Sequence, residues 1–154
     1  MTLYLFALLI GVIAGLRAMT APAAVSWAAW MGVLPLAGTP LGFLGSIVTV
    51  VIFTVLAIGE LISDQLPKTP SRKVPPQFIA RIVMGGLSGA AIGMTGGAWI
   101  GGLVAGVIGA VIGTLVGAEA RSRMAQAFGR DTPAAFIEDG VAILGAVAIV
   151  ALLA

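Results

Sequence analysis

Long apolar stretches with few charged residues constrain this chain more than any other feature. A helix crosses the hydrocarbon core of a bilayer, about 30 Å thick, in roughly 20 residues. Four stretches of about this length are almost wholly apolar: residues 41–62, 78–97, 98–118 and 133–154. Because the apolar residues are continuous and do not alternate with polar ones, they predict transmembrane helices and not the strands of a membrane barrel.

The composition excludes several classes of protein. Of the 154 residues, 60% are hydrophobic and only 9% are charged, whereas a soluble domain carries about 25% charged residues. So few charges exclude a soluble enzyme, a disordered chain and a nucleic-acid-binding domain. The partner that we expect for this chain is therefore the lipid bilayer. The chain has no cysteine and no histidine, which excludes disulfides, thiolate metal sites and the commonest general base. We expect no cofactor.

The first 38 residues leave two alternatives open. Apolar segments at 3–16 and 23–36 are separated by Arg17 and a Thr20-Ala21-Pro22 turn. They form either a hairpin of two short helices or one kinked helix that runs to Trp30. We favour the hairpin, with Thr20 as the N-cap and Pro22 in the first turn. The sequence then predicts a single all-α transmembrane domain over residues 1–154, with six membrane-crossing helices in three hairpins.

The charged residues fall on alternate helix junctions. Arg17 lies at the first junction, and residues 64–73 and 119–131 carry the charges of the third and fifth. The second and fourth junctions, residues 38–40 and 95–97, carry no charge. Because positively charged loops stay in the cytoplasm, this pattern predicts cytoplasmic charged loops and both termini outside.

Glycines recur at helical spacing in the apolar stretches 78–97 and 98–118. One stripe consists of Gly85, Gly89, Gly93 and Gly97, and the other of Gly102, Gly106, Gly109, Gly113 and Gly117. Small residues let membrane helices approach closely and gain dispersion contacts. We therefore expect a tight antiparallel hairpin with glycine-zipper packing, although such stripes also suit a dimer interface or a pore lining.

Six charged residues lie within or beside the apolar stretches, on the side predicted to be cytoplasmic. They are Arg17, Glu60, Asp64, Arg81, Glu138 and Asp139. Each uncompensated charge in the membrane costs at least about 2.5 kcal/mol. Mutual pairing is the expected solution, and it predicts one charge cluster at the cytoplasmic side.

The charge cluster has a structural and a functional interpretation. It is either a salt-bridge network that joins helix ends or a site for a cation, a proton or a polar substrate. Four carboxylates against two arginines leave an acidic excess, which would suit a hard divalent cation without requiring one. Glu119 and Arg123 differ, because opposite charges at i,i+4 predict an ordinary helix-end salt bridge.

The third junction carries four prolines in ten residues and is expected to be stiff and extended. Such a connector would hold Lys68, Ser71 and Arg72 near the charge cluster. These groups suit an anionic headgroup or a phosphate. The alternative is a rigid basic loop at the membrane surface.

Residues 60–72, with the sequence ELISDQLPKTPSR, resemble the motif of a bacterial integral-membrane family of unknown function. The resemblance covers nearly the whole chain and includes Gly15-Leu16-Arg17, Pro22-Ala23, Ala80-Arg81 and Glu138-Asp139. Members usually have Lys where this chain has Gln65, so one basic contact is expected to be absent. The resemblance implies no activity, but it implies that the polar residues of the charge cluster are motif positions, and it implies the bacterial cytoplasmic membrane.

Three hypotheses for function follow. The leading one is binding and transport of an ion or small polar solute at the charge cluster. A chain of this length is small for a transporter, which favours a homodimer. The second is a membrane-embedded enzyme for lipid-linked phosphate, in which Lys68, Arg72 and Arg81 neutralise phosphate beside carboxylate-bound Mg²⁺. The third is a structural or assembly protein without a substrate.

Overall fold

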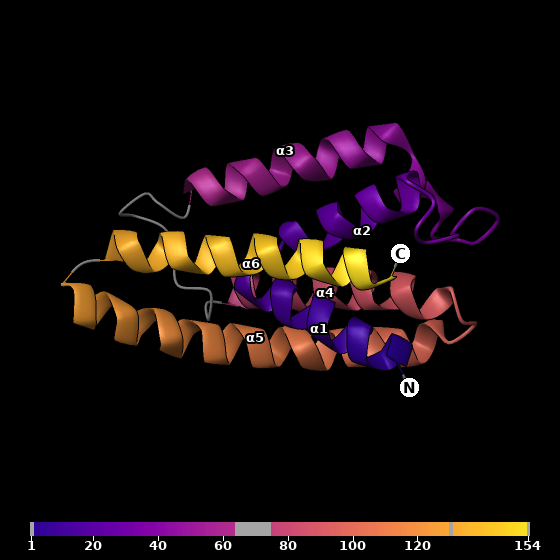
Figure 1. Ribbon diagram of the computed structural model, residues 1–154. Helices are drawn as coiled ribbons and strands as arrows, with labels where there is room; N and C mark the ends of the chain where they lie inside the picture. The colour runs from indigo at the N-terminus through magenta and orange to yellow at the C-terminus, as the bar shows by residue number, and fades with distance from the viewer. Residues whose placement is uncertain (1, 64–74, 130, 154) are drawn as a thin grey trace.

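The computed structural model describes residues 2–63, 75–129 and 131–153, and within these ranges the chain is helical without any strand. The helices lie side by side in a bundle (Figure 1). In chain order they are α1 Thr2–Leu16, α2 Thr20–Trp30, the short 3₁₀ helix η1 Gly42–Gly45, α3 Ile47–Ser63, α4 Pro75–Met94, α5 Trp99–Phe128 and α6 Asp131–Leu153. This confirms the predicted all-α bundle of six helices.

The predicted number of membrane-crossing helices is wrong. Within the described residues, three helices are long and apolar enough to cross a membrane: Pro76–Met94, Trp99–Phe128 and Pro133–Leu153. The helices α1 and α2 have only 15 and 11 residues, about 22 and 16 Å at 1.5 Å per residue. The helix α3, with 17 residues, is at the lower limit for a crossing. The cause is that apolar residues also form the connection between α2 and α3. Gly32, just after the end of α2, takes a positive φ of 84°, and Gly38 within the connection takes one of 81°.

The first segment forms the predicted hairpin, but it does not reach the end of the bundle. A Cβ atom placed on Gly15 would lie 2.5 Å from the backbone nitrogen of Thr114, so the end of α1 is level with Thr114. From there α5 continues to Phe128, about 21 Å further. The α1–α2 junction, residues 17–19, therefore lies inside the bundle (Figure 1).

Glycines bring the backbones of α1, α4 and α5 into contact. A methyl group on Gly89 would overlap the Gly102 carbonyl, and one on Gly106 would overlap the Gly85 carbonyl. The helix α1 packs at the same place on α5, where a methyl group on Gly11 would overlap the Gly106 carbonyl. Gly85, Gly89 and Gly93 thus face Gly102 and Gly106, as the spacing predicts. Further along the second stripe, Gly109 and Gly113 face the backbone of α1 instead.

The helix α5 extends well beyond the apolar stretch 98–118. Residues 119–128 are rich in Ala, Glu, Arg, Met and Gln, which are strong helix formers, so the helix continues after the apolar residues end. Gly129, with a φ of 76°, ends it in the left-handed conformation. The chain then reverses into α6, and both termini lie at the opposite end of the bundle (Figure 1).

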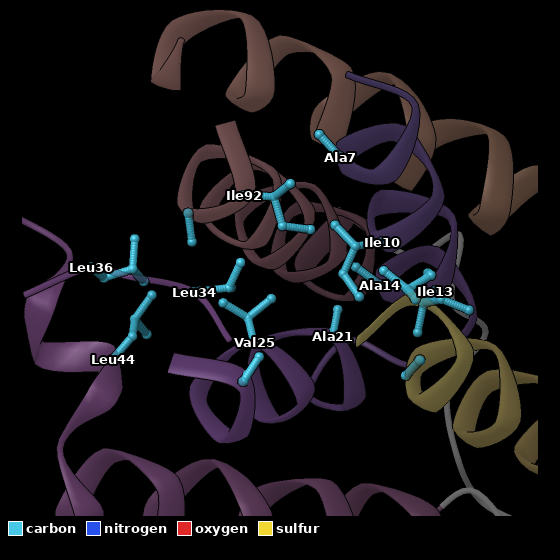
Figure 2. Close-up of a cluster of buried hydrophobic side chains, with 14 of the residues drawn as sticks. Ala7, Ile10, Ile13, Ala14, Ala21, Val25, Leu34, Leu36, Leu44 and Ile92 are labelled. Carbon is cyan, nitrogen blue, oxygen red and sulfur yellow. The ribbon is translucent and has the colours of Figure 1, made fainter. Parts of the chain in front are cut away.

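An apolar core fills the end of the bundle that carries the termini. Figure 2 shows Ile10 of α1, Val25 of α2, Ile92 of α4 and Leu34 of the following connection in one cluster. The helix α3 covers α2 from outside, where the Trp27 indole donates a 2.9 Å hydrogen bond from Nε1 to Thr54 Oγ1. The core thus joins the α1–α2 hairpin to α4 on the terminal side of the junction.

The glycine contacts predict opposite effects of alanine at two helical glycines. Gly106→Ala should lower the free energy of unfolding by about 1–3 kcal/mol, because its methyl group meets backbone that cannot yield. Gly140→Ala, where nothing lies within 4 Å of the new Cβ, should leave it unchanged or raise it by about 0.5–1 kcal/mol. Denaturation of both variants in detergent measures the difference, and equal stabilities would contradict the close packing.

Candidate functional site

Arg17 lies at the centre of the site, directly after the last residue of α1, with 0% of its surface exposed. Its Nε donates a 2.6 Å hydrogen bond to Asp139 Oδ1, and its Nη2 contacts the same oxygen. Its Nη1 lies 2.8 Å from Glu138 Oε1. Hydrogen bonds between ionised groups are about twice as strong as neutral ones, so Arg17 joins the α1–α2 junction firmly to α6.

Arg121 of α5 also reaches this site, which the sequence interpretation missed. Its Nη1 lies 3.4 Å from Glu138 Oε1. Arg121 stands eight residues before Gly129, and Glu138 nine residues after it. Residues equally far from the turn of an antiparallel helical hairpin face each other. This pairing would have been visible once the end of α5 was placed at Gly129.

Glu60 of α3 caps the N-terminus of α2. The backbone amide of Ala18 donates to Glu60 Oε2 and that of Met19 donates to Oε1, both at 3.0 Å. Amides at a helix N-terminus have no partner within the helix, and the helix dipole favours an anion there. The prediction of Thr20 as N-cap is wrong: Met19 is the N-cap residue and makes no side-chain cap bond, because a neighbouring helix supplies the cap.

Arg81 of α4 provides the complementary contact at the C-terminus of α1. Only 3% of Arg81 is exposed, and its Nη1 donates a 2.9 Å hydrogen bond to the Gly15 carbonyl. Carbonyls at a helix C-terminus lack partners and favour a cation. The two helix ends that meet inside the bundle therefore each face a side chain of opposite charge, and Arg81 and Arg17 also attract Glu60 electrostatically.

Five predicted site residues thus lie around the α1–α2 junction, together with Arg121. Among the described residues, the charge cluster thus differs from the predicted one by the addition of Arg121, and from here on the name means this set: Arg17, Glu60, Arg81, Arg121, Glu138 and Asp139. Four further predicted site residues lie outside the described residues: Asp64, Lys68, Ser71 and Arg72. The binding role of every one of these residues stays a prediction.

The charge cluster is electrically balanced in the part of the chain that the structure describes. Arg121 raises the arginines to three, against the carboxylates of Glu60, Glu138 and Asp139. Among the described residues, no group of three acidic side chains is placed to hold a metal ion. The acidic excess expected from the sequence included Asp64, which lies outside the described residues, so it stays a prediction. The described members of the cluster are held by ion pairs and hydrogen bonds.

The surface pair predicted from the i,i+4 spacing provides a contrast. Arg123 Nε donates a 2.9 Å hydrogen bond to Glu119 Oε1, with side chains that are 78% and 61% exposed. This confirms an ordinary salt bridge on α5. Solvent-exposed pairs of this kind add little stability, whereas Arg17, Glu138 and Asp139 hold their charges away from solvent.

Comparison with known proteins assigns this chain to no family. No protein-family model, no curated protein and no solved structure matches this chain. The fold and the apolar helices define the class, a helical integral membrane protein. Its family, suggested by the motif of residues 60–72, stays a prediction.

The burial of Arg17 predicts a large effect of its removal. Arg17→Gln should lower the free energy of unfolding by about 3–5 kcal/mol, because Glu138 and Asp139 would keep their buried charges and lose the Arg17 guanidinium. Arg123→Gln removes the exposed arginine and should leave the unfolding temperature unchanged. Thermal unfolding of the two variants in one detergent compares them, and equal loss would show that the buried pairs have no special importance.

Proposed function

We propose that this protein binds a small ion or polar solute at the charge cluster and transports it across the bilayer. One observation carries the proposal. A fully buried arginine, Arg17, lies between two acidic side chains at the meeting point of two helices too short to cross the membrane.

Short helices that meet inside a membrane bundle are the usual means by which transporters hold their substrates. Their free backbone groups and dipoles face the site and bind ions or charged groups of the solute. In this chain, Glu60 occupies the amides at the start of α2, and Arg81 occupies a carbonyl at the end of α1. In the proposed mechanism, an anionic group of the solute takes the place of Glu60, or a cationic group takes the place of Arg81.

The energetics support a role beyond stability. Buried ion pairs seldom stabilise a protein more than apolar side chains of similar volume would, and ionisable residues within membranes are usually functional. Three arginines and three carboxylates from several helices are therefore a costly way to join helix ends. A cluster whose pairs exchange for solute groups accounts for that cost.

A structural role is the second candidate, and one observation favours it. Arg17, Glu60, Arg81 and the acidic pair of α6 all have hydrogen-bond or ion-pair partners within the protein. Such pairing would suit a network that only joins the helices. The enzyme hypothesis depends on Lys68 and Arg72, which lie outside the described residues.

The proposed location is the bacterial cytoplasmic membrane, with the charged junctions in the cytoplasm and both termini outside. The positions of both termini at one end of the bundle, opposite the α5–α6 turn, support a common side for them (Figure 1). The excess of Arg and Lys at the other end supports its cytoplasmic orientation. A homodimer remains part of the proposal because the chain is short for a transporter.

Ligand binding at the charge cluster predicts a selective thermal shift. The purified protein is heated with sodium, potassium, magnesium, phosphate, acetate or zwitterionic amino acids. A probe that binds should stabilise it, by about 2.7 kcal/mol at 100 times its Kd. Glu60→Gln and Asp139→Asn should fold but lose this shift, whereas Glu119→Gln, which changes an exposed carboxylate, should keep it. If both cluster variants unfold and no probe shifts the wild type, the structural role is the better account.

The proposed orientation predicts opposite labelling at the two ends of the bundle. The chain has no cysteine, so single cysteines report their own position. In intact cells, a membrane-impermeant thiol reagent should label Ala37→Cys in the α2–α3 connection. It should not label Ala127→Cys near the end of α5 until the cells are opened. The reverse pattern would overturn the orientation.

A further inference from the structure

Three buried hydroxyl groups do not belong to the charge cluster. Ser26 of α2, Ser88 of α4 and Thr114 of α5 each have 0% of their surface exposed. Within the described part of the chain, none of these hydroxyls has a hydrogen-bond partner. They are thus polar groups in the interior of a membrane protein without the bonds that normally accompany burial.

Other hydroxyls in the same chain show the usual solution. A helical Ser or Thr can donate to a carbonyl one turn earlier in its own helix. Thr54 donates to the Val50 carbonyl and Thr95 to the Ile92 carbonyl, both at 2.7 Å. Ser26, Ser88 and Thr114 do not make this bond, so their hydroxyls stay available to another partner.

Thr114 lies at the level of the charge cluster. Its backbone is close enough to Gly15 that a Cβ atom on that glycine would overlap it. The Gly15 carbonyl is the group that accepts the hydrogen bond from Arg81. The hydroxyl of Thr114 therefore belongs to the helix turn that adjoins the α1–α2 junction.

Ser26 and Ser88 lie at one common depth, further towards the end that carries the termini. Ser88 follows Arg81 by two turns on the same face of α4, and Ser26 follows the first residue of α2 by nearly two turns. Both helices run antiparallel to α1 and contact each other. The two hydroxyls are therefore both about 10 Å from the junction along the bundle.

Apolar side chains close the interior beyond these two serines. Ile92 lies one turn further along α4, and Leu34 lies in the connection that follows α2. Figure 2 shows both in the apolar cluster, and both are buried. From the junction outwards, the interior thus passes from the charge cluster to apolar side chains, and Ser26 and Ser88 lie among these before the closure at Ile92 and Leu34.

We propose that Ser26, Ser88 and Thr114 line the route by which the solute moves between the charge cluster and the opposite end of the bundle. This inference rests on the proposed function. The hydroxyls bind water and a small hydrogen-bonding solute when the contact between α2 and α4 loosens around Ile92 and Leu34. They replace the hydration that a polar solute loses in the membrane interior.

Cysteine accessibility tests this route without knowledge of the solute. Ser26→Cys, Ser88→Cys and Thr114→Cys are close in size to the native residues, and the chain adds no cysteine of its own. Each variant, reconstituted in phospholipid vesicles, is treated with a charged methanethiosulfonate, which reacts with the hydrated thiolate. Ala91→Cys is the matched control, because Ala91 is equally buried on α4.

Cysteines at the three hydroxyl positions should react at least tenfold faster than Ala91→Cys. Rates equal to that of the control at all three positions would overturn the inference. The three positions lie on three different helices. If one variant misfolds, as its unfolding temperature would show, the other two still test the route. The ligand-induced thermal shift of the wild type decides the proposed function separately, so a shift without cysteine reactivity would overturn the route alone.

Discussion

The pairing of the Arg17 guanidinium with Glu138 and Asp139 is the interaction on which the rest of the arrangement depends. It allows the chain to reverse inside the bundle, where an unpaired charge would be prohibitive. The reversal creates two helix ends away from water, and each then needs a partner of opposite charge. Glu60 and Arg81 meet these needs, so charged groups of α3, α4 and α6 surround the reversal at Arg17.

The glycine contacts hold this junction in place. Because α1, α4 and α5 touch backbone to backbone through Gly11, Gly89 and Gly106, the end of α1 has a fixed depth relative to Thr114. Dispersion contacts replace the hydrophobic driving force that is lacking between helices in lipid. The ionic site and the packing are therefore linked. The glycines set the depth of the α1–α2 junction, and the charged side chains bind the backbone amides and carbonyl at its two helix ends.

The sequence was sufficient for features that follow from the free energy of single residues in a membrane. The expense of charge in hydrocarbon predicted that Arg17, Glu60 and Glu138 would meet, and glycine spacing predicted the α4–α5 contact. Features that depend on distant residues were not accessible. The cap of α2 comes from another helix, the role of Arg121 depends on where α5 ends, and the apolar residues between α2 and α3 are not helical throughout. Substrate chemistry leaves no local pattern, so it stayed a hypothesis.

The light attachment of α3 has a mechanical consequence. This helix packs mainly against α2 and η1, while α1, α4 and α5 form one tightly interlocked trio. Since Glu60 and Thr54 both bind the α1–α2 hairpin near or along α2, α2 and α3 are coupled to each other more strongly than α3 is to the trio. The helix α3 thus lies as a light arm on a stiff frame that includes α2, and a tilt of α3 would carry Glu60 away from the Ala18 and Met19 amides while the frame keeps its shape.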